Sequence, residues 1–308
     1  MLTQQQIRLW VPPATQIFQR YMPPIAAPYP KVYIASRRTH TVLREKLISQ
    51  TGNLHTSPPE DSIMEYIHGN TGNAILIRQD LLPDENDEHF CWMYWHELGH
   101  FYAISSEITN LHRYNDPSLV DDSSILDMSP ERVKQEGYWF WQEFIAQAIS
   151  NHVSYKHRST ERDYHPEQID WCPEMWGGIV ERLMDLLDAT FWHYPTTIDE
   201  YSLAHYFALL LKDDFAMLYC KAAVEGKLRV FGDRNGREIY PAEKIEPTCI
   251  SDMVDVFQPP LWRMKALLDE KLSTDLFWSI DEGFLLELGK CVGALMIAKL
   301  KLLAELEC

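Results

Sequence analysis

The chain has 308 residues, of which 46% are hydrophobic and 12% aromatic, enough apolar side chains for a packed core. Its formal net charge of -17 would repel a phosphate backbone or an anionic lipid surface, so we expect neither nucleic acid nor a membrane as a partner. The first residues lack a signal-peptide pattern, no long apolar run follows, and six cysteines are scattered singly, which together favour a cytoplasmic protein with free thiols.

The first part of the chain is expected to form a small α+β unit. Six prolines within residues 1–30 predict an irregular, Pro-rich N-terminal arm with a short helix near 14–21. The segment 31–36 alternates like a strand, 39–50 reads as a helix, and 64–79 has two apolar runs around a Gly-Asn-Thr-Gly turn. We therefore expect a small, mostly antiparallel sheet with one helix on it.

Two long helices are expected next. An acidic cluster complements the dipole of the first, which should run from about 86 to 105. Residues 110–128 are rich in Asn, Asp, Ser and Pro and read as a long exposed loop. Ser129 as N-cap, with Pro130 at the first helical position, then opens a second helix that should continue through about Val153.

In the second half of the chain, apolar residues recur mainly at helical spacing. This change predicts a first domain over 1–160 and a mainly helical domain over 161–308. Within the second domain, two short apolar runs around Asp-Arg-Asn-Gly predict a β-hairpin near 228–241. Apolar residues recur every three to four positions over 174–191, 198–212, 252–272 and 283–306.

The sequence HELGH at residues 96–100 lies inside the first long helix. Residues four apart lie on one face of a helix, so the imidazoles of His96 and His100 can converge on one metal ion. A catalytic zinc keeps three protein ligands and a water, and it needs a nearby carboxylate to take a proton from that water. Glu97 is the candidate for this general base.

The third ligand has to come from beyond HELGH. A metzincin would need a glycine and a histidine further along the helix, where this chain has Ala103 and Ser106. A gluzincin instead takes a glutamate from a later helix. Glu143 lies there among apolar residues, where an unpaired carboxylate would be costly and a metal would neutralise it, so we choose Glu143. The alternatives that stay open are Glu136, Glu131 and Glu107.

HELGH followed by a helix containing Glu-Phe-Ile-Ala resembles the gluzincin metallopeptidases and, more distantly, the ImmA/IrrE type. The resemblance covers about residues 31–155 and implies a zincin-like metallopeptidase domain that binds one Zn²⁺ through His96, His100 and Glu143. It also puts Gln147 where thermolysin-like enzymes have an aspartate. The chain shows no helix-turn-helix pattern, so the resemblance does not extend to a repressor-like role.

These residues predict a zinc-dependent peptidase that hydrolyses bonds in a peptide or protein substrate by a metal-activated water, with Glu97 as general base. Two alternatives stay open: a non-catalytic binding or scaffold protein that retains a zincin-like metal site, and an enzyme that hydrolyses a non-peptide substrate with the same site. A peptidase also needs a donor for the oxyanion of the tetrahedral intermediate, and the sequence does not single one out. The candidates are Tyr138, His152, His193, Tyr194, His205 and Tyr206.

Overall fold

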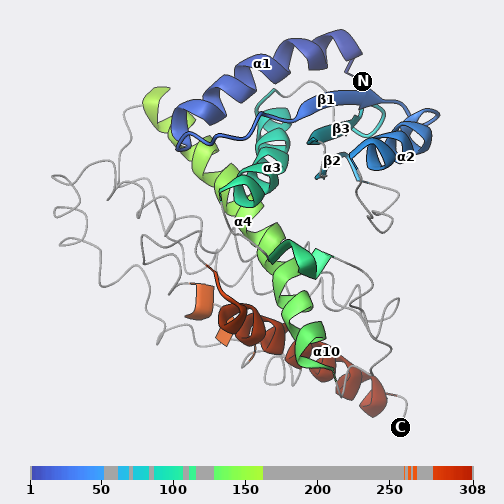
Figure 1. Ribbon diagram of the computed structural model, residues 1–308, viewed down its shortest axis with the longest axis vertical. Coiled ribbons are helices and arrows are strands. Elements are labelled where there is room, and N and C mark those ends of the chain that lie inside the picture. The colour runs from blue at the N-terminus through green and yellow to red at the C-terminus, as the bar shows by residue number, and fades with distance from the viewer. Residues whose placement is uncertain are drawn as a thin grey trace, which may run out of the picture. The chain divides into compact units, whose positions relative to one another are not determined.

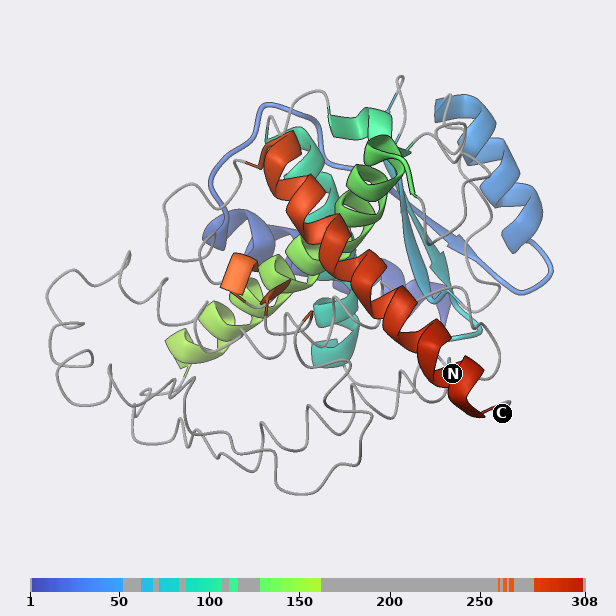
Figure 2. The same ribbon diagram turned by 90° about the horizontal axis from the view of Figure 1, so that it is seen from below.

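The structure is a computed structural model, shown in Figure 1 and turned by 90° in Figure 2. It describes residues 2–51, 62–68, 72–82, 87–106, 111–115, 128–161, 260, 263–264, 266–268 and 280–306. In chain order its elements are α1 (Gln4–Tyr21), β1 (Lys31–Ala35), α2 (His40–Thr51), β2 (Met64–Ile67), β3 (Ala74–Arg78), α3 (Asp87–Ser105), the 3-10 helix η1 (Leu111–Asn115), α4 (Pro130–Glu161) and α10 (Glu282–Leu306).

The chain divides into two compact units, and α4 runs through both of them. One unit comprises Met1–Val120 with Ile145–Arg158, and the other comprises Asp121–Phe144 with Ser159–Cys308. The described elements are mostly helical, with one small sheet, so the protein is of the α+β class.

Helix α1 begins at a capping box. The Thr3 hydroxyl accepts a hydrogen bond from the backbone N–H of Gln6 at 3.2 Å, and the Gln6 side chain accepts one from the Thr3 N–H at 2.8 Å. The predicted irregular arm is wrong for residues 4–13, because the helix expected near 14–21 already begins at Gln4 and continues through Pro12 and Pro13, whereas residues 22–30 are irregular as predicted. A proline inside a helix removes a backbone donor and costs about 3 kcal/mol.

Packing of α1 on α3 offsets this cost. Ala14 and Phe18 are completely buried. The Trp95 indole N–H donates to the carbonyl of Ala14 at 2.9 Å, and the hydroxyls of Thr15 and Tyr94 lie 3.0 Å apart. Burying one large apolar side chain stabilises by about 1.5–3 kcal/mol. Tertiary contacts therefore outweigh the local preference of the two prolines for non-helical structure.

The sheet has three strands in the order β1-β3-β2. β2 and β3 pair antiparallel, with Met64 opposite Ile77, which confirms the predicted hairpin. β1 pairs with β3 in parallel, with Lys31 opposite Ala74. The sheet is therefore mixed, whereas the sequence predicted a mostly antiparallel one. The reason is that β3, the second strand of the hairpin, lies next to β1 and runs in the same direction.

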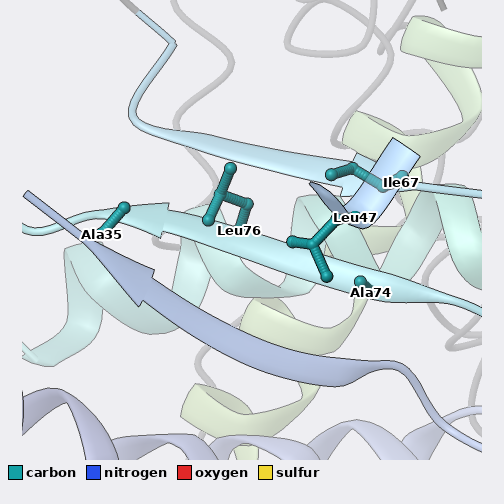
Figure 3. Packing of buried hydrophobic residues seen from close by; sticks show 5 residues of the cluster. All are labelled: Ala35, Leu47, Ile67, Ala74 and Leu76. Atoms are coloured by element: carbon teal, nitrogen blue, oxygen red, sulfur yellow. The ribbon is translucent and has the colours of Figure 1, made fainter. Parts of the chain in front are cut away.

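Helix α2 covers one face of the sheet. Side chains on opposite faces alternate along each strand. Tyr66 therefore points away from α2 to the other face, where its ring centroid lies 6.3 Å from that of Phe101 in α3. Figure 3 shows the cluster between α2 and the sheet, whose members are at most 3% exposed: Ala35, Leu47, Ile67, Ala74 and Leu76.

Charged side chains link α2 to the sheet. Arg44 donates from Nε and from Nη2 to the Glu65 carboxylate, both at 2.8 Å, and these two side chains are only 12% and 13% exposed. The Arg78 guanidinium donates to Asp80 at 2.8 Å and lowers the pKa of that carboxyl. Burial, and next the charge of Arg78, lower the pKa of His40 at the start of α2.

Helix α3 occupies almost the predicted range and is buried on most sides. Burial raises the pKa of Tyr94 and of Tyr102 to about 12. A helix of this kind forms the centre of a core, which holds its side chains in fixed positions. The α3 residues that are at most 5% exposed are Phe90, Tyr94, Trp95, His96, Leu98, Phe101, Tyr102 and Ala103.

Helix α4 begins where the sequence predicts it. The Ser129 hydroxyl accepts a hydrogen bond from the N–H of Arg132 at 3.2 Å, and Pro130 is the first helical residue. The helix extends to Glu161, beyond the expected end near Val153. In these additional turns the His157 ring lies edge-on to the Trp95 ring of α3, with the centroids 6.2 Å apart.

In the second unit, α10 crosses the first half of α4 at close range. A Cβ atom on Gly137 would overlap the backbone of Leu285, and one on Gly289 would overlap the backbone of Val133. Lys134 adds a salt bridge to Glu282 at 2.9 Å. Glycines thus allow the two backbones to approach each other.

Helix α10 confirms the helix predicted over 283–306. The division into domains at residue 160 stays a prediction. Among the described residues, no helix combines the length and apolarity needed to cross a membrane. The other expectations for the second half, namely the helices at 174–191 and 198–212, most of the helix at 252–272 and the hairpin at 228–241, lie outside the described residues, as does most of the predicted loop at 110–128.

Candidate metal centre

The HELGH segment places two imidazoles on one side of α3. His96 and His100 are one helical turn apart, and their Nε2 atoms lie 3.1 Å from each other. Two nitrogens bound to one zinc at about 2.0–2.1 Å with a tetrahedral angle lie about 3.4 Å apart. The two rings are nearly perpendicular, at 85°. Little movement is therefore needed for both nitrogens to bind one ion.

Glu143 of α4 completes a group of three. One ligand atom each from His96, His100 and Glu143 lies within 4.8 Å of the other two. These are the three residues that the sequence predicted as ligands, and together they form a site that can hold a metal ion. Two imidazole nitrogens with one carboxylate oxygen make up a donor set known for catalytic zinc, whereas calcium and magnesium prefer oxygen ligands alone.

Gln147 fixes the orientation of His96. Nδ1 of His96 lies 3.0 Å from Oε1 of Gln147, and both residues are buried. Because an amide oxygen can only accept, Nδ1 carries the proton and Nε2 presents its lone pair toward His100. A hydrogen bond of this kind holds a metal-ligating histidine in the correct tautomer. Gln147 follows Glu143 by one turn of α4, so one helix supplies both a ligand and the support for another.

A close approach of α3 and α4 brings these residues together. A Cβ atom on Gly99, the glycine of HELGH, would lie 2.6 Å from the carbonyl oxygen of Ala146. Further along the same contact, one turn after Ala146 in α4 and two turns before Gly99 in α3, the Ser150 hydroxyl donates to the carbonyl of Trp92 at 2.6 Å. Only glycine fits at this crossing, and the short distance between the backbones lets the side chains of α4 reach the histidines of α3.

Glu97, the predicted general base, directly follows His96 and is 8% exposed. A carboxylate so far from bulk solvent is well suited to exchange protons inside a site. Its role as a base stays a prediction, because it depends on a substrate and an ion.

The hairpin contributes side chains beside the centre that the sequence did not single out. Tyr66 of β2 stacks on His100, with the ring planes 5° and the centroids 6.4 Å apart. Its hydroxyl donates to Oδ1 of Asn73 at 2.8 Å, and Nδ1 of His68 lies 2.9 Å from the same oxygen. The alternation of side chains along β2 predicts that Tyr66 and Ile67 lie on opposite faces of the sheet. Only the packing of the sheet on α3 shows that the face with Tyr66 meets the histidines.

The other candidate ligands have different surroundings. Glu136 is buried and forms an ion pair with Arg132 one turn earlier in α4. Glu131 is 59% exposed and lies 3.7 Å from Lys134. Glu107 lies outside the described residues. Neither described alternative belongs to the group formed with the two histidines.

Of the candidate oxyanion donors, only Tyr138 has a described side chain. It is 3% exposed, burial raises its pKa, and it forms a hydrogen bond with Gln142 on the same helix. The side chains of His152, His193, Tyr194, His205 and Tyr206 are outside the described part of the chain.

Comparison with known proteins adds no family. No protein-family model matches the chain, and searches of the curated proteins and of the solved structures found no match. The candidate site therefore rests on its own residues, which are two histidines one helical turn apart and a glutamate brought beside them by a second helix.

Proposed function

We propose that the chain is a zinc-dependent peptidase of gluzincin type, in which His96, His100 and Glu143 bind the metal and Glu97 is the general base. The observation that supports this most strongly is the grouping of the three predicted ligands within 4.8 Å. The hydrogen bond from His96 to Gln147 is consistent with it, because a metal-ligating histidine donates its other ring N–H to a fixed acceptor.

The ligands and Glu97 would have different roles in the reaction. His96, His100 and Glu143 would hold the zinc ion, which would polarise a carbonyl and lower the pKa of a bound water to about 7. The Glu97 carboxylate would take a proton from the attacking water and later deliver it to the leaving amine nitrogen. Its burial keeps that proton from bulk solvent during the reaction.

A peptide substrate is favoured by the strand that lies next to the histidines. β2 is an outer strand of the described sheet and packs on α3. An extended peptide that adds to the edge of such a strand is held by backbone hydrogen bonds. Since Tyr66 of β2 stacks on His100, a peptide running along β2 would pass close to the centre.

Metal content is the first test of this proposal. After identical chelator washing, the wild type should retain about one zinc per chain, whereas His96→Ala and Glu143→Gln should lose it. Glu131→Gln is the matched control, because Glu131 lies on the same helix and is 59% exposed, so this variant should keep its zinc. A wild-type protein that takes up no metal when zinc is offered would overturn the proposal.

The role of Glu97 is tested separately. Glu97→Gln should keep the zinc but lower the rate of peptide cleavage about 100- to 10,000-fold, the range for loss of a general base. A peptide library with mass-spectrometric readout measures this. A zinc-loaded wild type that cleaves nothing would instead identify the chain as a non-catalytic binding or scaffold protein, and the peptidase proposal would fail.

A further inference from the structure

The charge along the chain is distributed very unevenly. The first 44 residues contain six basic residues and no acidic one, although the whole chain has 45 acidic and 28 basic residues. A segment of this kind carries a positive local field on an otherwise acidic protein. The basic residues are Arg8, Arg20, Lys31, Arg37, Arg38 and Arg44.

Within this basic segment, β1 has an open edge. The N–H of Lys31 donates to Asn73, and the carbonyl of Ala35 accepts from Gln79, so the odd-numbered residues of β1 turn their backbone groups toward β3. The N–H and C=O groups of one residue lie on the same side of a strand, and this side alternates. Those of the even-numbered residues, 32 and 34, therefore point away from β3, and no described residue provides a hydrogen bond to them.

A groove runs along this edge. It has a volume of about 280 Å³ and is lined on the α1 side by Val11 and Pro12 and on the α2 side by Leu43, with Val32 and Ile34 between them. Figure 1 shows α1 running beside β1. A strand added here would have its alternating side chains directed toward the two apolar sides in turn.

One cation lies at the start of β1, and another lines the groove. Arg8 of α1 is exposed and lines it, and Lys31 is the exposed first residue of β1. Neither forms an ion pair with any residue that the structure describes. An occupant with carboxylates would therefore gain charge-assisted contacts that the protein itself does not supply.

We propose that this groove binds an extended, acidic peptide segment of another protein, which adds a strand to the open edge of β1. The unpaired backbone groups of residues 32 and 34 can form hydrogen bonds with a peptide in β conformation. The apolar walls of the groove favour apolar side chains on that peptide, and the charges of Arg8 and Lys31 favour acidic ones. The groove lies at the β1 edge of the sheet, whereas His100 of the candidate metal centre stacks on Tyr66 of β2, so the proposal does not depend on peptidase activity.

Fluorescence anisotropy tests the surface directly. The probe is a fluorescein-labelled ten-residue peptide that alternates valine and glutamate, titrated with the full-length chain in the presence of a chelator. Arg8→Glu should weaken its binding about tenfold or more, the effect of losing one contact to a charged group. Arg20→Glu is the matched control. It makes the same change at an exposed position of the same helix outside the groove, and should change the affinity by less than about twofold.

N-methylated peptides test strand addition without changing the protein. Methyl groups on one alternating set of amides should abolish binding, and on the other set should leave it nearly unchanged, because only one set faces β1. Equal effects of both sets would overturn the proposal, as would equal binding by the Arg8→Glu variant or no binding of the probe. Displacement of the probe by single-stranded DNA would assign the groove to nucleic acid. A dimer in sedimentation that Ile34→Pro dissociates would assign it to a second copy of the chain.

Discussion

Replacing Gly99 by alanine should damage the metal centre without touching a ligand. The added Cβ would lie 2.6 Å from the carbonyl oxygen and 2.8 Å from the Cα of Ala146, whereas ordinary contacts begin at 3.4 Å. Both atoms belong to the backbone of α4 and cannot rotate away. The two helices would therefore have to separate by about 0.8 Å at the crossing.

The magnitude follows from two opposing effects. Overpacking of this kind costs about 1–3 kcal/mol, while alanine gains about 1 kcal/mol over glycine inside a helix. The free energy of unfolding of the metal-free protein should thus fall by up to about 2 kcal/mol. Metal binding should suffer more, because ligand distances tolerate only about 0.2 Å, and we expect a loss of tenfold or more in zinc affinity.

Urea unfolding and zinc competition against a chelator measure the two effects. Gly293→Ala is the matched control: its Cβ would also lie 2.6 Å from a neighbour, but that neighbour is Cε of Met128, the flexible end of a side chain. This variant should be neutral or slightly stabilised and should bind zinc as the wild type does. Wild-type stability and zinc affinity in Gly99→Ala would refute the close approach of α3 and α4.

Three further perturbations follow from the contacts described above. Gln147→Leu removes the acceptor of the His96 Nδ1 proton and should lower zinc affinity about 10- to 100-fold, measured by the same competition assay; an unchanged affinity would contradict the supporting role of Gln147. Arg44→Met leaves the Glu65 carboxylate unpaired and should cost about 3 kcal/mol in urea unfolding, most of which the double variant with Glu65→Leu should recover; additive losses would argue against the pair. The folded protein lowers the pKa of His40 below its ordinary value of 6.5, so the unfolded chain binds the proton more readily, and the free energy of unfolding should fall as the pH drops below about 6.5. In chelator-treated protein, His40→Gln should flatten this pH dependence. A pH profile identical to that of the wild type would exclude His40 as its cause.

The parts of the fold that the sequence predicted are those set by neighbouring residues. The cap formed by Ser129 and Pro130, the antiparallel pairing of β2 with β3, and the spacing of His96 and His100 all depend on residues close together along the chain. Glu143 was found because a carboxylate in an apolar stretch of helix needs a counter-charge.

The parts that the sequence did not predict depend on contacts between distant segments. Pro12 and Pro13 have the same local preference in any chain, and only burial of α1 on α3 keeps them helical. The hairpin signal shows that β2 pairs with β3 but not which of them β1 joins. Likewise, Gly99 marks a close approach only when the residue opposite it is known to be Ala146.

The docking of α1 on α3 also has a consequence for folding during synthesis. The hydrogen bonds that join these helices link residues 79 and 81 positions apart. At about 5–20 residues per second, a ribosome completes α3 roughly 4–16 s after the matching part of α1 has been made. During that interval Phe18 and its neighbours have no partner to cover them, so α1 is the segment on which chaperones should act first, and slowing translation between the two helices should increase aggregation of the nascent chain.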